Sequence, residues 1–491
     1  MSLAKGFARD GIGASLLGFE IFVRWTSLRE TAQFHLSGKT RFDGYTADDG
    51  LVTAQSRSSR ILARPVWEKW CRFDRQPGDR DAERPVIPGN PREREMNIAP
   101  GKSAVSKIPF DQARVDRLME EAGIDVLLAS SKHNTQYLLG GYKFIFFAAM
   151  DAIGHSRYLP IVIYEKGGPD HAAYIGNRME GGEHQNNPFW TPTLHAACWG
   201  TLDAANLAVE HLQKIGKAGA RIGIEPGFLP SDAYTLIRKA LPEAKLIDAT
   251  DMLERMRAIK TDAELEKLRT ASELITDSML ATIQWAHEGT TKAEMIEQLR
   301  REETNRGIHF EYCLLTLGSS HNRAASPQAW KKGEVLSIDS GGNYHGYIGD
   351  LCRMGILGEP DAELEDLLAE VETVQQAAFS KVKAGTLGGD MISHAEGVLK
   401  KSKVAAYTDF FAHGMGLITH EAPFLMTNHP VTYEGTYAAK PLEKNMVLSV
   451  ETTMLHPTRG FIKLEDTLAV TESGYVMFGD RGRGWNRGGI S

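Results

Sequence analysis

The stretch LSIDSGGNYHGYIGDLCR, residues 336–353, limits the possible folds of this chain more than any other part of its sequence. It opens as an apolar strand that ends at Asp339, and two glycines, Gly341 and Gly342, follow. A second strand then returns and ends at Asp350. We therefore predict a β-hairpin that turns at the two glycines and brings the two carboxylates toward one point.

The two aspartates of this hairpin allow two interpretations. Two carboxylates held together in a partly buried place repel each other, so Asp339 and Asp350 would need a shared proton, a cation or solvent between them. Aspartate also ends strands and occupies turns for purely structural reasons. The hairpin alone does not decide between a functional site and a structural turn, so the rest of the chain has to.

Length and composition describe an ordinary globular protein with more than one domain. The chain has 491 residues, which exceeds a single typical hydrophobic core. Its apolar fraction is 42% and its net charge is −7, so nucleic acid is not an expected partner. No window approaches the roughly 20 apolar residues that span a bilayer, so we expect no membrane association. The four cysteines are widely separated, which suggests reduced thiols in a cytoplasmic protein.

Residues 1–95 differ from the rest of the chain. Between residues 51 and 95, Arg, Asp, Glu, Pro and Gly are mixed with little periodicity, which argues against a packed core. Charged residues also interrupt the apolar runs near the N-terminus, so we expect no signal peptide. We predict that residues 1–95 are a poorly ordered extension rather than a functional domain.

Strands and helices alternate from residue 110 onward. The segment 110–123 has apolar residues at helical spacing and stops at Gly123, and 124–130 is an apolar strand. We interpret 134–142 as a turn followed by more apolar chain. Further strands are predicted at 159–165, 172–176, 221–227 and 244–250, and further helices at 205–219 and 231–241. This alternation predicts an α/β domain over residues 96–255.

A second domain is predicted over residues 256–491. Thr261 and Glu264 form a capping box, which indicates the start of a long helix. Further helices are predicted at 291–306, 360–384 and 389–402, and strands at 308–317, in the hairpin and up to about residue 478. Helices combined with antiparallel hairpins favour an α+β fold for this half.

Four further acid or imidazole residues follow the hairpin. His413 lies between an apolar strand and a glycine-rich turn, and His420 follows seven residues later. A lone histidine in such a place is usually structural, but a pair is less easily explained so. Glu451 and Glu465 each interrupt an apolar strand, where a charged carboxylate needs a partner because desolvation costs several kcal/mol. Lys463 is close enough to neutralise one acid, but not all of them.

Five residues of the second domain therefore stand on predicted strands or strand ends: Asp339, Asp350, His413, Glu451 and Glu465. Carboxylates with one imidazole suit Mn²⁺, Fe²⁺, Co²⁺ or Zn²⁺. The excess of carboxylates favours two ions, about 3.5–4 Å apart, over one tetrahedral zinc. A set of unrelated surface acids is the alternative.

These motifs resemble a known family. The segments DSGGNYHGYIGD, HGMGLITHEAP, SVET and IKLEDTLAVTESGY are similar to those of the pita-bread metallopeptidases, family M24, which include prolidase, aminopeptidase P, methionine aminopeptidase and creatinase. The segment GIDVLLASSKHNTQYLLGG resembles the creatinase-type N-terminal domain. The resemblance covers roughly residues 108–480. It implies a pita-bread catalytic domain preceded by a creatinase-type α/β domain.

The resemblance also implies a role for each of the five residues. Asp339 would bind one metal ion only, and Asp350 and Glu465 would bridge both ions. His413 and Glu451 would complete the shell of the second ion. Mn²⁺ is the first choice for both ions, with Co²⁺, Fe²⁺ and Zn²⁺ as alternatives.

The same comparison implies catalytic roles. A bridging water would be the nucleophile, with Glu451 as the proton acceptor. His420 stands where the family has an imidazole that steadies the tetrahedral intermediate. The family's substrate-binding histidine before the hairpin has no clean match here, and His321, eighteen residues before Asp339, is the best candidate.

The chain departs from the family pattern at several positions. Lys463 replaces an arginine two residues before the last glutamate, and lysine lacks the planar fork for a bidentate contact. Thr452 and Thr453 stand where Pro-Gly is usual, and Cys352 replaces a threonine. These changes leave the metal set intact but put the substrate in doubt.

The resemblance implies a cytoplasmic, homodimeric Xaa-Pro peptidase that cleaves before proline in a dipeptide or short peptide. Function depends on the site rather than the fold, so alternatives stay open. One is a lyase like the dimethylsulfoniopropionate lyase of this fold. The others are a creatinase-like C–N hydrolase and a binding module that has kept the fold.

Overall fold

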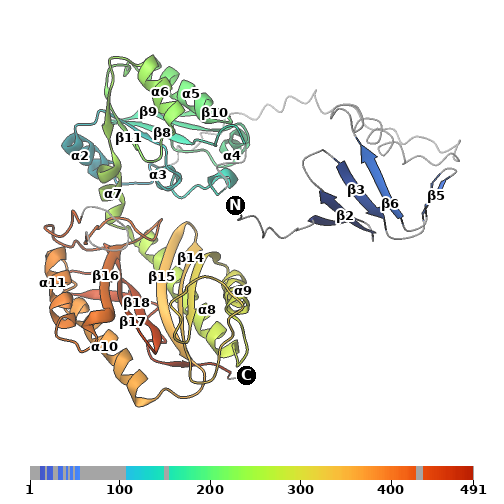
Figure 1. The fold of residues 1–491 in the computed structure, drawn as a ribbon. Coiled ribbons are helices and arrows are strands. Elements are labelled where there is room, and N and C mark those ends of the chain that lie inside the picture. Colours follow the sequence, from blue (N-terminus) through green and yellow to red (C-terminus); the bar gives the residue numbers. More distant parts are fainter. Residues whose placement is uncertain are drawn as a thin grey trace, which may run out of the picture. The chain divides into compact units, whose positions relative to one another are not determined.

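The computed structural model describes residues 107–148, 154–426 and 435–489, together with the backbone of six strands between residues 12 and 55. The chain divides into two compact units, Met1–Gly101 and Lys102–Ser491. Figure 1 shows the second unit as two layered domains. No helix in the described part of the chain is long and apolar enough to cross a membrane.

The first unit contains strands that the sequence analysis did not predict. An antiparallel sheet has the order β1-β2-β3-β6, and β4 pairs with β5. Their bounds are β1 Ile12–Leu16, β2 Phe19–Trp25, β3 Thr31–Leu36, β4 Thr40–Phe42, β5 Tyr45–Ala47 and β6 Gly50–Gln55. The rest of the predicted extension lies outside the described residues, so its poor order stays a prediction.

The second unit begins with an α/β domain around a six-stranded mixed sheet of order β10-β9-β8-β7-β11-β12. Its strands are β7 Val126–Ala129, β8 Ile161–Glu165, β9 Gly168–Asn177, β10 Thr193–Cys198, β11 Arg221–Ile224 and β12 Lys245–Asp248. Its helices are α2 Gln112–Ala122, α3 Lys132–Leu138, α4 Glu180–Asn186, α5 Thr201–Lys214, α6 Ser231–Ala240 and α7 Thr250–Ala258, with a 3-10 turn η2 at Ile145–Phe147.

Two apolar layers hold this sheet. Helices α5 and α6 pack on one face through side chains such as Leu212 and Ile237. Helices α2 and α7 pack on the other through side chains such as Met119 and Leu253. An α/β sandwich of this kind confirms the fold class predicted from the alternating pattern.

One predicted turn is a helix. Residues 134–142 were expected to turn, but most of this segment belongs to α3, which Ser131 caps by accepting a hydrogen bond of 3.2 Å from the Asn134 backbone amide. The buried residues of α3 are largely polar, among them His133, Asn134 and Gln136. Helix α3 therefore lacks the apolar periodicity by which helices are recognised. The prediction also missed α4, β10 and α7.

The α+β half is built on an eight-stranded sheet of order β13-β14-β15-β18-β17-β16, with β19 beside β18 and β20 beside β15. The strands are β13 His309–Leu317, β14 Val335–Tyr344, β15 Tyr347–Ile356, β16 Thr408–Gly414, β17 Val447–His456, β18 Gly460–Val470, β19 Tyr475–Phe478 and β20 Asn486–Arg487. The helices are α8 Asp262–Trp285, α9 Lys292–Asn305, α10 Ala362–Phe379 and α11 Gly388–Leu399, with a 3-10 turn η3 at Ala405–Tyr407.

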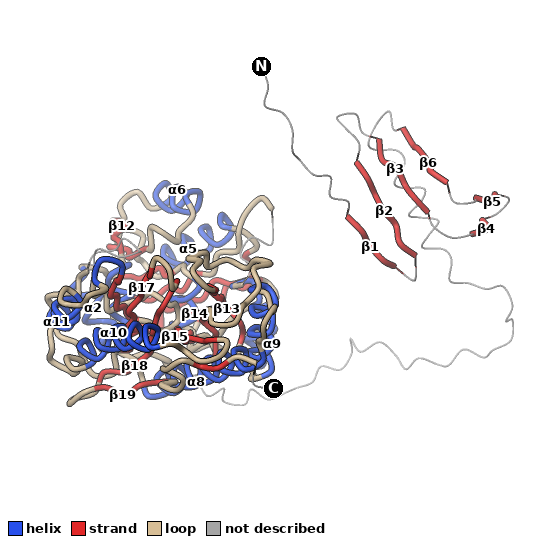
Figure 2. The backbone as a smooth tube through the Cα atoms, turned by 60° about the horizontal axis from the view of Figure 1, so that its bottom comes forward, coloured by secondary structure: helices blue, strands red, loops and turns tan. Residues whose placement is uncertain are grey.

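The helices cover the two halves of this sheet separately (Figure 1 and Figure 2). Helices α8 and α9 pack on β13, β14 and β15. Helices α10 and α11 pack on the half that contains β16, β17 and β18. Capping boxes at Thr261 and Thr291 start α8 and α9. The capping box at Thr261 confirms the one predicted from the sequence.

The hairpin forms, but it does not turn where the sequence analysis placed the turn. The chain reverses at His345 and Gly346, both with positive φ (49° and 96°), while Gly341 and Gly342 lie within β14. A Cβ atom on Gly341 would lie 2.3 Å from the Tyr312 ring. The glycine at this position therefore makes room for Tyr312 rather than reversing the chain.

Candidate active site

Five adjacent strands deliver the five candidate ligands to one cavity of about 380 Å³. These are Asp339 on β14, Asp350 on β15, His413 on β16, Glu451 on β17 and Glu465 on β18. The register aligns them, because Glu465 pairs with both Cys352 and Glu451, and Asp350 pairs with Gly341. Antiparallel pairing thus gathers residues that are far apart in the sequence.

Three of these side chains form a tight buried cluster. Donor atoms of Asp350, His413 and Glu465 all lie within 4.8 Å of one another. His413 Nε2 lies 3.7 Å from Glu465 Oε1, and His413 Nδ1 lies 3.2 Å from the Gly414 carbonyl oxygen. A carbonyl oxygen can only accept a hydrogen bond, so Nδ1 carries the ring proton. The lone pair of Nε2 is then free to bind a cation. The three side chains fit a divalent ion.

Lys463 lies among the remaining acids. Its Nζ is 2.7 Å from Asp339 Oδ2 and 2.8 Å from Glu465 Oε2, and it forms an ion pair with Glu451. The lysine side chain is only 5% exposed. The sequence analysis expected Lys463 to neutralise a single acid, whereas the structure places it against three.

The loop before the hairpin supplies a different residue from the one predicted. His321 is exposed, it contacts the His456 carbonyl at 3.3 Å, and it is not among the described side chains that line the cavity. Arg323 lines the cavity instead, donates to Asp339 and lies over the Phe461 ring at 5.2 Å. In the sequence, the only sign of Arg323 as a site residue was its position two residues after His321.

His420 lies in the cavity as predicted. Its ring stacks on that of His413, with 4.0 Å between centroids and 10° between planes. Burial, together with the neighbouring His413, lowers the pKa of His420 to about 3. Its Nδ1 is buried and has no hydrogen-bond partner among the described residues. His420 is therefore a neutral imidazole at physiological pH.

The four acidic candidate ligands need positive charge nearby in order to stay ionised. Burial raises the pKa of Asp339, Asp350 and Glu451, and carboxylate neighbours such as Glu465 add to the rise. Burial also opposes the charge on Glu465, but Lys463 and His413 lower its pKa below the usual range. Positive charge is therefore what keeps these acids ionised.

Two hydroxyl groups that the sequence analysis missed orient the acids. Tyr312 on β13 donates to Asp350 Oδ1, and Ser449 Oγ on β17 donates to Glu465 Oε1 at 2.8 Å. Neither has a distinctive sequence motif. Their positions follow only from strand pairing, which brings β13 and β17 beside the ligand strands.

A buried ion network holds the segment that carries His420. Its neighbour Glu421 accepts from Arg257 Nε at 3.2 Å and from Lys260 Nζ at 3.0 Å, and all three side chains are 1% exposed. Arg257 also donates to Asn134, which belongs to the α/β domain. Contacts between the two domains of the second unit therefore reach the segment that carries His420.

Apolar side chains line part of the cavity. They include Leu314, Phe411, Leu455 and Phe461. Leu314 and Leu455 are 36% and 37% exposed, so apolar surface is open to a ligand at the mouth. Such a site combines a few placed polar groups with hydrophobic contact area.

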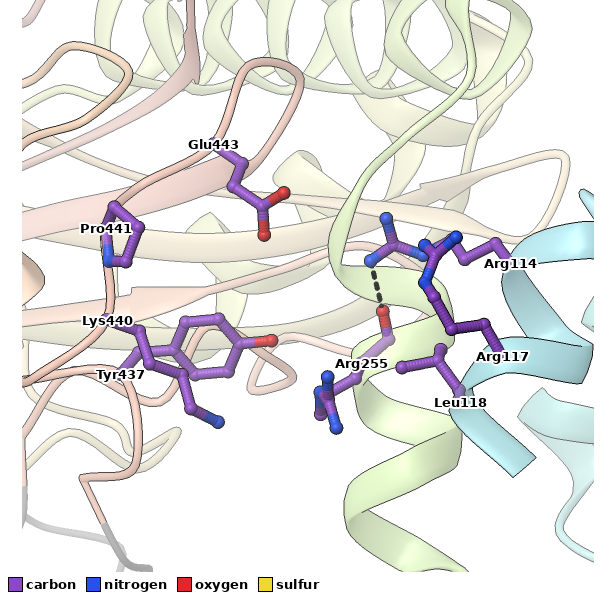
Figure 3. A pocket seen from close by; sticks show the side chains of 8 residues that line it. All are labelled: Arg114, Arg117, Leu118, Arg255, Tyr437, Lys440, Pro441 and Glu443. Atoms are coloured by element: carbon purple, nitrogen blue, oxygen red, sulfur yellow. Dashed lines mark hydrogen bonds between the residues drawn. The ribbon is translucent and has the colours of Figure 1, made fainter. Parts of the chain in front are cut away.

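A second cavity, of about 210 Å³, contains none of the predicted site residues (Figure 3). Its lining includes the cationic side chains of Arg114, Arg117, Arg255 and Lys440. Arg114 Nη2 donates a hydrogen bond of 2.8 Å to the backbone carbonyl oxygen of Arg255, which is the dashed line in Figure 3. Among the described residues, this lining combines four cations with a single acid, Glu443, and so differs from the acid and imidazole lining of the cavity that contains His413 and Glu465.

An α/β domain followed by an α+β domain, with buried acids and imidazoles on adjacent strands, defines a two-domain pita-bread protein. Residues 266–472 match the model of metallopeptidase family M24, and residues 112–259 match the creatinase/prolidase N-terminal domain. Residues 266–472 are therefore a domain of the metallopeptidase family M24 type, as the motifs indicated.

Individual relatives agree with this assignment. A probable dipeptidase PepE of Mycobacterium bovis is 28% identical over 235 residues, 46% of this chain and 60% of that protein, so the match spans less than two thirds of its length. An Xaa-Pro dipeptidase of Pyrococcus furiosus is 26% identical over 54% of this chain and 75% of its own. The structure of an Xaa-Pro dipeptidase from Bacillus anthracis, 20% identical, has the same fold, with a TM-score of 0.65 over 77% of this chain and 98% of its own.

Proposed function

We propose that this chain is a divalent-metal-dependent peptidase that hydrolyses the bond before proline in a dipeptide or short peptide. The observation that carries the proposal is the buried cluster of Asp350, His413 and Glu465 beside an apolar cavity. The names of the relatives, dipeptidase and Xaa-Pro dipeptidase, support a peptide substrate. Those names do not favour the lyase or the creatinase-like alternative.

Each group of the cavity has a role in this proposal. A divalent ion held by the cluster would polarise the substrate carbonyl and lower the pKa of a bound water. Glu451 lines the cavity and would accept the proton of the attacking water. His420, held neutral by burial, would donate a hydrogen bond to the oxygen of the tetrahedral intermediate.

The apolar wall is the basis for a proline preference. The pyrrolidine ring of proline has no charge and no N–H to satisfy in a peptide bond. It can pack on Leu455 and Phe461 without leaving a buried polar group unpaired. A preference for Mn²⁺, a cytoplasmic location and a homodimer are further parts of the proposal.

The direct test is hydrolysis by the metal-loaded chain. Incubated with Mn²⁺, the protein should cleave Ala-Pro or a longer Xaa-Pro peptide faster than the matched Ala-Ala substrates, as followed by mass spectrometry. Failure to cleave either proline peptide, with metal shown to be bound, would exclude this function.

Asp350→Ala tests the metal cluster itself. It removes one of three clustered donors, so we expect bound Mn²⁺ and peptide hydrolysis to fall together, hydrolysis by at least about 100-fold, since removal of one critical catalytic group costs that much. Asp248→Ala, at an exposed position on β12, is the control. Full activity of Asp350→Ala would show that the ion is held elsewhere.

A further inference from the structure

The Lys463 ammonium group lies among acids that the resemblance assigns to metal ions. It contacts three carboxylates, those of Asp339, Glu451 and Glu465, from three different strands. With 5% of its side chain exposed, these carboxylates replace water as its partners. Oxygen atoms that converge on one point from several strands are also what a hard divalent ion requires.

Asp339 has a second cation. Arg323 donates to the same oxygen, Oδ2, that accepts from Lys463. Asp339 is the residue that the resemblance assigns to one metal ion alone, yet here two side-chain cations already neutralise it. Asp350 differs, since in the described part of the chain it accepts from the Tyr312 hydroxyl and makes no ion pair with a cationic side chain.

We infer that Lys463, with Arg323, replaces one of the two metal ions, so that this chain holds a single divalent ion at Asp350, His413 and Glu465. The inference rests on the proposed metal-dependent function and refines it. It also changes the prediction from the sequence, in which all five residues bind metal. Asp339 and Glu451 then hold the ammonium group of Lys463 instead.

Charge balance supports one ion. When ionised, the carboxylates of Asp339, Asp350, Glu451 and Glu465 carry four negative charges, which one divalent ion together with Lys463 and Arg323 would balance. A second ion on Asp339 and Glu451 would lie beside the Lys463 ammonium group. Two cations in contact repel strongly in a buried site, where the effective dielectric constant is low.

The test counts the ions in the intact chain. The chelator-treated protein is saturated with Mn²⁺, freed of unbound metal and analysed by plasma mass spectrometry and by electron paramagnetic resonance. We expect one Mn²⁺ per chain and the hyperfine pattern of an isolated ion. In Lys463→Met the ammonium group is gone, and we expect a second ion and a spin-coupled signal.

Lys444→Met, at an exposed lysine before β17, is the matched control and should keep one ion. Two spin-coupled ions in the unmodified chain, or none, would overturn the inference. A folded Lys463→Met chain that still binds one ion would overturn it too. If that variant does not fold, the count in the unmodified chain still decides.

The count is independent of peptide hydrolysis. One bound ion without cleavage of Xaa-Pro peptides would remove the proposed substrate and leave this inference standing. Cleavage of Xaa-Pro peptides by a chain that binds two ions would support the proposed function and overturn this inference.

Discussion

His420 is a neutral, half-buried imidazole stacked on the candidate ligand His413, and its buried Nδ1 has no hydrogen-bond partner among the described residues. Such a ring can offer a hydrogen bond to a developing oxyanion without binding the metal. We therefore expect His420→Ala to lower kcat by about 100-fold. Metal content, measured by plasma mass spectrometry, should stay unchanged.

An exposed histidine on α11 provides the control for this substitution. His394→Ala should leave both kcat and metal content as they are. If His420→Ala loses the metal, then His420 is a ligand and its assigned role is wrong. The two measurements together separate these roles.

At the scale of elements, the sequence predicted which strands carry the site but not how they are packed. Asp339 and His413 were found at the ends of apolar strands and Glu465 inside one, and the structure brings them to one cavity. The hairpin turn was misplaced because glycine suits both turns and close packing, and only the ring of Tyr312 shows which applies at Gly341. Such a contact depends on strand pairing that no local pattern records.

Packing between α9 and the hairpin contains a buried acid, Glu303. Its Oε1 lies 3.1 Å from Ser340 Oγ, whose single proton is nearer to the Tyr312 carbonyl oxygen, at 2.7 Å. A protonated Glu303 that donates to Ser340 leaves the Ser340 proton for the Tyr312 carbonyl oxygen, while Glu303 Oε2 stays without a partner among the described residues. Burial raises the pKa of Glu303 to about 8, which agrees with this arrangement.

The raised pKa of Glu303 predicts a pH-dependent stability. In the unfolded chain the group ionises near pH 4.5, but in the folded protein only near pH 8, so unfolding releases a proton between these values. The free energy of unfolding should therefore fall as pH rises through this window. The side chain in Glu303→Gln cannot ionise. At pH 8 this variant should therefore unfold at a higher urea concentration than the unmodified chain, with a free energy of unfolding larger by at least about 1 kcal/mol.

Glu288→Gln, at an exposed position after α8, is the control and should not change this pH dependence. The comparison is made by urea unfolding at pH 5 and pH 8. Equal stability of Glu303→Gln and the unmodified chain at pH 8 would show that Glu303 is ionised in the folded protein.

At the scale of the molecule, a series of buried polar contacts joins the α/β domain to the segment that carries His420. Glu225 accepts from Asn134 Nδ2 at 2.7 Å, Asn134 accepts from Arg257, and Arg257 donates to Glu421 beside His420. Glu421 and Arg257 are 164 residues apart in the sequence. Nothing in the sequence distinguishes these two residues from exposed charged residues, so only the fold reveals that they are buried together.

Arg257→Met tests whether this network positions the catalytic segment. It leaves Glu421 with Lys260 as its remaining cation and removes the ion pair to Glu254, so we expect a loss of about 3–5 kcal/mol in the free energy of unfolding. Because Glu421 adjoins His420, kcat should fall in the folded fraction while the metal content is retained. Arg257→Lys keeps the charge but loses the planar fork, so it should recover part of both. The control is Arg238→Met, at an exposed position on α6, which should change neither the stability nor kcat. Unaltered stability and kcat in Arg257→Met would show that Lys260 alone holds Glu421 in place.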